Sequence, residues 1–231
     1  MSDDVSVSLM AQDLTRQYYE LNADEYFTAT RGVQLTHLWN VITRELTPQA
    51  LILDLGCGSG RDLRYFSQKD FRVVGLDYSY GLLKLAKDFS RQRVVLGDIT
   101  RLPFQESVFD AVWAVGSLLH ISRDELPSVL AQIQKILKPN SYFLASIKKG
   151  HGDVIDTLGR RTFLYQGDEW ASLLQDMGFQ ISELDEIVEH RQIPIGDEGS
   201  ITWIMCLAQP IDKRQTKTPS ETGELSLASS W

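Results

Sequence analysis

Short apolar runs alternate with longer amphipathic stretches along most of the chain. Five runs have the length and continuous hydrophobicity of strands buried on both faces: 51–55, 72–76, 94–96, 111–115 and 142–147. The stretches around them repeat apolar residues at helical spacing: 11–29, 33–46, 60–68, 80–89, 123–137 and 168–177. Strands and helices in alternation predict an α/β protein with a doubly wound, mostly parallel sheet.

The carboxyl-terminal part of the chain completes this sheet. Residues 179–187 and 200–207 are predicted to pair as an antiparallel hairpin, which gives seven strands with an antiparallel final strand. The polar, glycine-containing segment 149–166 is predicted to be a connection.

The sequence 51–61, Leu-Ile-Leu-Asp-Leu-Gly-Cys-Gly-Ser-Gly-Arg, carries the main chemical signal. An apolar strand runs into Asp54, alternating glycines follow at Gly56, Gly58 and Gly60, and a helix begins. Because glycine has no side chain, a glycine-rich backbone can turn tightly and come into contact with a ligand. The free N–H groups at the N-terminus of the following helix can donate to a negatively charged group of that ligand. Arg61 stands where the dinucleotide fingerprint has its third glycine, so the spacing disfavours NAD.

Acidic residues end the next two predicted strands. Asp77 is placed to accept hydrogen bonds from both hydroxyls of a ribose, although a helix-capping role is the alternative. Tyr78 is placed to lie against an adenine. The Asp98 carboxylate and the Ile99 N–H can pair with the amine and a ring nitrogen of adenine, while an ordinary turn role for Asp98 is the alternative.

Composition narrows the class of protein. The chain has 231 residues, of which 43% are hydrophobic and 23% charged, enough for one domain with a full core. The net charge of −8 disfavours a nucleic-acid partner. Two cysteines predict neither a disulfide framework nor a metal site. No apolar run is long enough for a membrane span and the first residues lack a secretory pattern, so the expected location is cytoplasmic.

Five segments in order resemble the motifs of class I S-adenosyl-L-methionine-dependent methyltransferases of the small-molecule type: 53–60, 74–79, 97–104, 109–113 and 136–140. The resemblance implies a Rossmann-like domain over 49–210, with S-adenosyl-L-methionine as cofactor. It also implies an N-terminal helical lid over 1–48, while the polar tail 211–231 is predicted to be disordered. One departure is Ser141, where many members have glycine.

The resemblance also assigns cofactor contacts. Asp54, Gly56 and Gly58 would face the methionine part, and the helix pattern before the glycine turn implies that aromatic rings such as Tyr19 and Tyr26 close over the cofactor. Packing of an amphipathic helix is the alternative explanation for that pattern. Val115 and Leu118 would border the transferred methyl group.

His120 follows directly in the segment that should border the acceptor. Its imidazole is a candidate base for a hydroxyl or ammonium acceptor, or a neutral packing residue. The basic residues of 149–166 fit either an anionic acceptor or an ordinary surface connection.

The sequence therefore predicts direct in-line methyl transfer to a small-molecule or peptide acceptor, with O, N, S or C as the accepting atom. Three alternatives remain: an NAD-linked oxidoreductase, a methyltransferase-like binding or regulatory protein without turnover, and an RNA or protein methyltransferase. Tyr-x-x-x-Lys occurs at 65–69 and 80–84, but both copies lie too early in the chain for the catalytic pair of a short-chain dehydrogenase.

Overall fold

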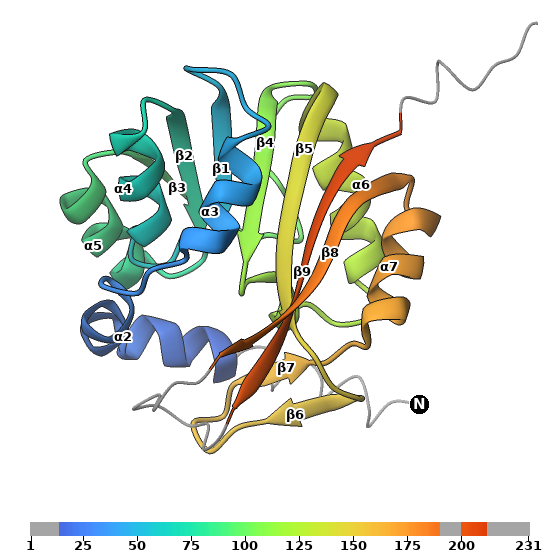
Figure 1. The fold of residues 1–231 in the computed structure, drawn as a ribbon. Coiled ribbons are helices and arrows are strands. Elements are labelled where there is room, and N and C mark those ends of the chain that lie inside the picture. Colours follow the sequence, from blue (N-terminus) through green and yellow to red (C-terminus); the bar gives the residue numbers. More distant parts are fainter. Residues whose placement is uncertain (1–13, 190–199, 212–231) are drawn as a thin grey trace, which may run out of the picture.

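The structure is a computed structural model that describes residues 14–189 and 200–211. Its main feature is one seven-stranded sheet in the order β3-β2-β1-β4-β5-β9-β8 (Figure 1). The strands are β1 (Leu51–Leu55), β2 (Arg72–Asp77), β3 (Arg93–Leu96), β4 (Phe109–Val115), β5 (Leu137–Lys148), β8 (Phe179–Glu189) and β9 (Ile201–Pro210). β9 lies between β5 and β8 and is antiparallel to both, which confirms the predicted antiparallel final strand.

The helices follow the strands as the alternation predicts. They are a helix over residues 14–21, then α2 (Ala23–Thr30), α3 (Thr36–Thr43), α4 (Arg61–Gln68), α5 (Tyr80–Ser90), the short 3₁₀ helix η1 (Leu118–His120), α6 (Leu126–Ile136) and α7 (Gly167–Asp176). Local chemistry sets several of their ends. The Ser79 side chain accepts from the N–H of Leu82 and caps α5, and Pro127 lies in the first turn of α6.

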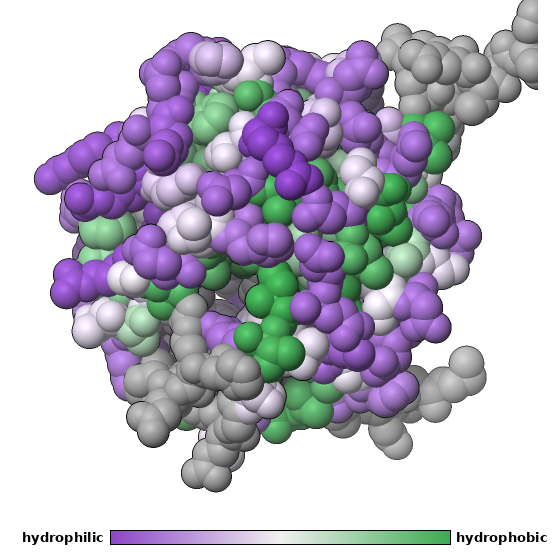
Figure 2. Space-filling view, viewed as in Figure 1, coloured by the Kyte–Doolittle hydropathy of each residue, from purple (hydrophilic) through white to green (hydrophobic). Residues whose placement is uncertain are grey.

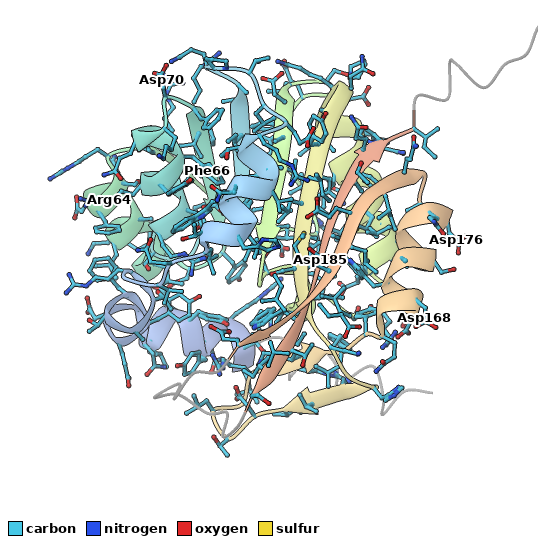
Figure 3. The ribbon with its side chains drawn as sticks, in the orientation of Figure 1. Arg64, Phe66, Asp70, Asp168, Asp176 and Asp185 are labelled. Atoms are coloured by element: carbon cyan, nitrogen blue, oxygen red, sulfur yellow. The ribbon has the colours of Figure 1, made fainter. Side chains whose placement is uncertain are left out.

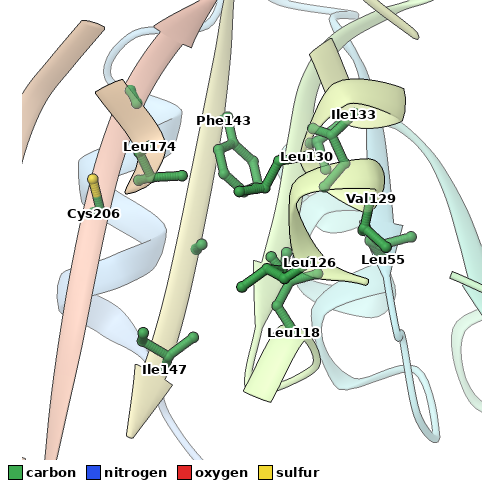
Figure 4. Packing of buried hydrophobic residues seen from close by; sticks show 14 of the residues in the cluster. Leu55, Leu118, Leu126, Val129, Leu130, Ile133, Phe143, Ile147, Leu174 and Cys206 are labelled. Carbon is green, nitrogen blue, oxygen red and sulfur yellow. The ribbon is translucent and has the colours of Figure 1, made fainter. Parts of the chain in front are cut away.

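Two apolar clusters sandwich the sheet. On one face α3, α4 and α5 cover Ile52, Ala111 and Trp113. On the other face α6 and α7 cover Leu53, Val112 and other strand residues, and Figure 4 shows side chains of α6 packed toward Phe143 of β5. Because the covering helices change face between β1 and β4, the carboxyl ends of these strands open a crevice where ligands bind in such sheets.

The predicted connection over 149–166 is wrong in part. Two short antiparallel strands, β6 (Asp153–Ile155) and β7 (Arg161–Phe163), form a separate sheet there. Three-residue strands are too short to leave a periodic signal in the sequence.

The single helix predicted over 11–29 is two helices in the part that the structure describes. Asn22 separates them, and its side-chain amide donates to the carbonyl of Tyr18 at 2.8 Å, the same oxygen that accepts from the Asn22 backbone N–H at 3.0 Å. Residues 11–13 and the predicted tail from 212 onward lie outside the described residues.

The face of the molecule shown in Figure 2 is mainly polar, with hydrophilic side chains around its edge and a group of apolar residues through its centre. Among the helices of the described residues, none combines the length and apolar composition that a membrane span needs.

Candidate active site

One cavity gathers most of the predicted site residues at the carboxyl ends of β1 to β4. Tyr19, Tyr26, Gly56, Gly58, Asp77, Tyr78, Asp98, Ile99 and His120 all line it. Asp54, Val115 and Leu118 are not among the described residues of its wall. Asp54, in β1 two residues before the glycine turn, and Leu118, the first residue of η1, are both buried. Parallel strands bring these positions together because their carboxyl ends share one sheet edge.

The glycine turn needs glycine at two positions for steric reasons. Gly56 has φ +77°, and a Cβ there would lie 2.4 Å from Cβ of Ser117. Gly60 has φ +89°, and a Cβ there would lie 2.8 Å from Cα of Ala86 in α5. A side chain at either position would be strained and would push the turn away from its neighbours.

Asp77 ties the glycine turn to the end of β2. Its Oδ2 accepts from the N–H of Gly58 at 2.8 Å and its Oδ1 from the N–H of Ser79 at 2.9 Å. Burial raises the pKa of Asp77, and the backbone N–H groups of Ser79 and Gly58 offset part of that rise. Each oxygen keeps further acceptor capacity, which a ribose hydroxyl can use.

Two buried polar atoms beside the inner end of the cavity lack a partner among the described residues, and only one of them, on Ser117, belongs to a residue of the cavity wall. They are Oδ2 of Asp54 and the hydroxyl of Ser117, both buried. Burial, and then the nearby charge of Asp62, raise the pKa of Asp54 well above its ordinary value, while Arg61 acts in the opposite direction. An ammonium group, such as that of the amino-acid part of S-adenosyl-L-methionine, would supply the missing partner of this oxygen and favour the ionised form of Asp54.

A buried polar network supports the turn from behind. Asp62 accepts from Arg61 through two bonds, Nε to Oδ1 at 3.0 Å and Nη2 to Oδ2 at 2.7 Å. It also accepts from the indole N–H groups of Trp39 at 2.9 Å and Trp113 at 3.0 Å. Arg61, which replaces the third glycine of the dinucleotide pattern, is therefore a structural partner of Asp62. One carboxylate connects α3, α4 and β4.

At the outer end, protein groups already engage Asp98, one of the predicted adenine partners. Oδ1 of Asp98 accepts from the N–H and the hydroxyl of Thr100, each at 2.8 Å. Oδ2 accepts from Arg16 at 2.6 Å, and the Arg16 guanidinium lies 4.2 Å from the centre of the Tyr78 ring. Burial alone would raise the pKa of Asp98, but the Thr100 donors and Arg16 lower it below its ordinary value.

His120 is held between the N-terminal helix and β7. Its Nδ1 lies 2.6 Å from the carbonyl oxygen of Arg161, and its Nε2 lies 3.0 Å from the hydroxyl of Tyr19. A carbonyl only accepts, so Nδ1 carries the proton and Nε2 accepts from Tyr19. Burial lowers the pKa of His120 to about 4, helped by the charges of Arg160 and Lys148. The imidazole is therefore neutral at pH 7.

Hydrogen bonds hold the helix over residues 14–21 against the cavity. Glu20 accepts from the Ser79 hydroxyl at 2.7 Å and from the N–H of Gly81. The Thr15 hydroxyl accepts from the N–H of Arg161 at 2.9 Å. Sequence reasoning missed Thr15 and Arg16 as wall residues. The signal that could have found Arg16 is its spacing of three residues before Tyr19, which puts both on one helix face.

The basic residues of the β6–β7 region pair with acids of the same region. Arg160 forms a bond of 2.6 Å with Asp156, and Arg161 one of 2.7 Å with Asp153. These pairs compensate both guanidinium charges. An anionic acceptor therefore stays a prediction without added support from this segment.

Outside the cavity, His37, Glu183 and Asp185 bring ligand-type atoms within 4.8 Å of one another. None of the three lines the cavity. Glu183 is already paired with Arg44.

Comparison with known proteins identifies the family to which this chain belongs. Residues 53–145 match the family described as "Methyltransferase domain". The uncharacterized methyltransferase YodH of Bacillus subtilis is 30% identical over 179 residues, which cover 72% of this chain and 73% of YodH. A methyltransferase of Encephalitozoon cuniculi is 34% identical over 133 residues, covering 55% of this chain and 59% of the relative.

Among solved structures, the 1,6-didemethyltoxoflavin-N1-methyltransferase of Burkholderia thailandensis has a TM-score of 0.70 at 21% identity, over 92% of this chain and 91% of that enzyme. Its structure contains 1,6-didemethyltoxoflavin and S-adenosylhomocysteine. This likeness concerns the fold. Together with the YodH match and the cavity, it places the chain in the class I, Rossmann-like S-adenosylmethionine-dependent methyltransferase family. The chain spans about half the length of several curated relatives that it matches.

Proposed function

We propose that this protein transfers a methyl group from S-adenosyl-L-methionine to a small-molecule or peptide acceptor by direct in-line displacement. The observation that carries the proposal is the cavity, in which the glycine turn, Asp77 and Asp98 from three successive strand ends meet. Family membership supports the same reading. Small-molecule acceptors are named for the Burkholderia enzyme and for a phosphoethanolamine N-methyltransferase of Arabidopsis thaliana that matches this chain.

The residues of the cavity fit the proposed cofactor at both ends. Asp54 Oδ2 and the Ser117 hydroxyl would meet the amino-acid part, Asp77 the ribose, and Asp98 with Ile99 the adenine. Bound there, S-adenosyl-L-methionine supplies a methyl group already activated by its sulfonium. The protein then has to position the acceptor and exclude water, and good positioning alone is worth roughly 7–11 kcal/mol of the barrier in model reactions.

We propose the N-terminal residues 1–48 as the lid that excludes water. The support comes from residues 14–21, which contribute Tyr19 to the wall and are fastened to Ser79 and Gly81 through Glu20. Tyr19 and Tyr26 meet edge to face, with ring centres 5.3 Å apart, so the two proposed lid aromatics support one another.

His120 is proposed as the proton acceptor when the methyl acceptor arrives protonated. Because Nδ1 donates to the Arg161 carbonyl, the basic lone pair is on Nε2 and points at the Tyr19 hydroxyl. A proton would therefore reach Nε2 through Tyr19 or after Tyr19 moves aside. The low pKa of His120 makes it a weak base, which suits an acceptor whose proton becomes acidic during transfer.

We also propose a cytoplasmic location and no nucleic-acid partner. Both cysteines, Cys57 and Cys206, are unpaired and buried, which suits a reducing compartment. The net charge of −8 opposes binding to a phosphate backbone.

Calorimetry with S-adenosylhomocysteine, S-adenosyl-L-methionine and NAD tests the cofactor. We expect both adenosyl compounds to bind and NAD to give no heat. Well-folded protein that takes up neither adenosyl compound would contradict the proposal. Release of S-adenosylhomocysteine over a panel of small molecules and peptides then tests turnover, and binding without release across the panel would favour a regulatory role.

A further inference from the structure

Arg16 makes two contacts at the outer end of the cavity. Its Nη2 donates to Oδ2 of Asp98 at 2.6 Å, and its guanidinium carbon lies 4.2 Å from the centre of the Tyr78 ring. Thr100 already donates twice to the other oxygen of Asp98. Arg16 therefore takes the oxygen of Asp98 that Thr100 leaves open.

These two contacts are the ones that an adenine would make there. Adenine is planar, would lie against Tyr78 and would donate from its exocyclic amine to Asp98. A guanidinium is also planar, donates from its edge and stacks on aromatic rings. An adenine bound there would therefore need the carboxylate oxygen and the Tyr78 ring that Arg16 contacts.

Arg16 also stands between two hollows of the surface. Arg16, Tyr78 and Asp98 line the inner cavity, and the same three residues line a more open groove outside it, together with Tyr80 and Leu96. Tyr80 and Leu96 are 61% and 59% exposed, so the outer groove is open to solvent. The Arg16 side chain therefore forms part of the partition between the cavity and the groove.

We propose that Arg16 is an internal competitor for the adenine subsite, holding Asp98 and Tyr78 until the adenine of the cofactor displaces it. This inference rests on the proposed function, because it takes an adenosyl compound as the ligand. It follows that the apparent affinity for the cofactor is lowered by the fraction of molecules in which Arg16 occupies the subsite.

Displacement of Arg16 does not require the helix to leave. Glu20, one helical turn further on, holds the helix to Ser79 and Gly81 independently of Arg16. The Arg16 side chain is 33% exposed and borders the outer groove, so it can swing into solvent while the helix stays in place. Removing the guanidinium therefore opens the subsite without removing the lid.

Calorimetry with S-adenosylhomocysteine and with adenosine on Arg16→Ala tests this inference. Half-exposed ion pairs and cation–π contacts are individually weak, so we expect Kd to fall about fivefold for both ligands relative to the wild type. Arg16→Lys keeps the charge but loses the planar stack and should lie between the two. Arg64→Ala is the matched control, because Arg64 makes a similar contact 4.6 Å over Phe89, away from the cavity, and lies on the outer side of α4 (Figure 3).

Salt provides a second readout that a purely structural role would not move. S-adenosylhomocysteine carries no net charge at neutral pH, whereas the Arg16–Asp98 ion pair is screened by salt. Raising NaCl from about 0.05 M to about 0.5 M should tighten S-adenosylhomocysteine binding to the wild type about twofold and leave Arg16→Ala unchanged.

Weaker or unchanged S-adenosylhomocysteine binding by folded Arg16→Ala would overturn the inference, since it would make Arg16 a partner of adenine or a bystander. That result leaves the proposed function intact, because the wild type still binds the ligand. Absence of binding in both proteins would overturn the proposed cofactor and this inference with it.

Discussion

The inner and outer ends of the cofactor cavity differ in whether their polar groups already have hydrogen-bond partners in the protein. At the inner end, Asp54 and Ser117 are buried with an atom each that no described residue satisfies. At the outer end, Asp98 and Tyr78 are half open and already engaged by Thr100 and Arg16. Strand ends and the glycine turn build the inner end, whereas the Arg16 side chain covers part of the outer end.

This difference indicates which end of the cavity contributes more binding energy for the cofactor. Unsatisfied buried groups gain most from a ligand, because leaving them unpaired costs about 1–3 kcal/mol each. Groups already satisfied gain little when one donor replaces another. Changes at the inner end should therefore have large effects, and changes at the outer end small ones.

Gly56→Ala, at the inner end, should have the largest effect on ligand binding. The new Cβ would lie 2.4 Å from Cβ of Ser117, at a residue with φ +77°. We expect a loss of about 3 kcal/mol in the free energy of unfolding and at least about 100-fold weaker S-adenosylhomocysteine binding, measured by urea unfolding and calorimetry.

A second substitution distinguishes a clash with Ser117 from a general folding defect as the cause of the lost stability. Ser117→Gly removes the opposing Cβ and should recover about half of the lost stability in the double variant. Gly32→Ala is the control, because a Cβ there meets nothing within 4 Å. Normal ligand binding by Gly56→Ala would refute the assigned role of the turn.

Asp62→Ala should destabilise the support behind the inner end. It leaves Arg61 and the indole N–H groups of Trp39 and Trp113 buried without their acceptor. Breaking a buried charged network costs about 3–5 kcal/mol, which urea unfolding would show. Asp88→Ala removes an exposed pair with Arg91 and should cost less than about 0.5 kcal/mol. Equal losses in the two variants would contradict the network.

Because of His120, the free energy of unfolding should depend on pH in the acidic range. Because burial lowers its pKa from 6.5 to about 4, the unfolded chain binds more protons than the folded chain between these values. The contribution is complete above pH 6.5 and is lost as the pH falls toward 4. Between about pH 7.5 and pH 4.5, the wild type should lose about 2 kcal/mol more than His120→Asn.

The comparison of the two proteins isolates His120, since the raised pKa values of Asp54 and Asp77 are common to both. Parallel loss of stability in wild type and variant would show that the imidazole is not held neutral.

Tyr78→Leu should have the smallest effect, as expected at the outer end. Tyr78 is 51% exposed, and both the adenine and Arg16 would lose the same ring face. We expect S-adenosylhomocysteine binding to weaken about threefold, and Tyr78→Phe to bind as the wild type does, by calorimetry. A loss above tenfold for Tyr78→Leu would show that the outer end carries more binding energy than its exposure indicates.

The sequence predicted those parts of the site that are local along the chain. The glycine turn, Asp77 and Asp98 each follow a strand directly, and the rule that parallel strands end at one edge brings them together. The cap of α5 is local in the same way, because Ser79 directly precedes the helix and accepts from the Leu82 N–H. Periodicity located most of the long elements, because burial of one face controls their pattern, but it did not reveal the break at Asn22 within the predicted helix 11–29.

Contacts between distant segments could not be predicted in this way. Arg16 and Asp98 are 82 positions apart, and Tyr19 and His120 are 101 apart. Their pairing depends on how the N-terminal helix crosses the sheet edge, which no local pattern records. The same holds for Arg61, whose partner network with Asp62 requires indoles from α3 and β4.

The placement of β9 has a consequence for synthesis on the ribosome. β8 joins the main sheet only through β9, which pairs with β5 on its other side. Until the last of these strands, Ile201–Pro210, has left the exit tunnel, β5 is an open edge and β8 has no neighbour. A nascent chain that stalls before this point would expose the unpaired edge of β5 to chaperones, so the seven-stranded sheet can be completed only after Pro210 has emerged.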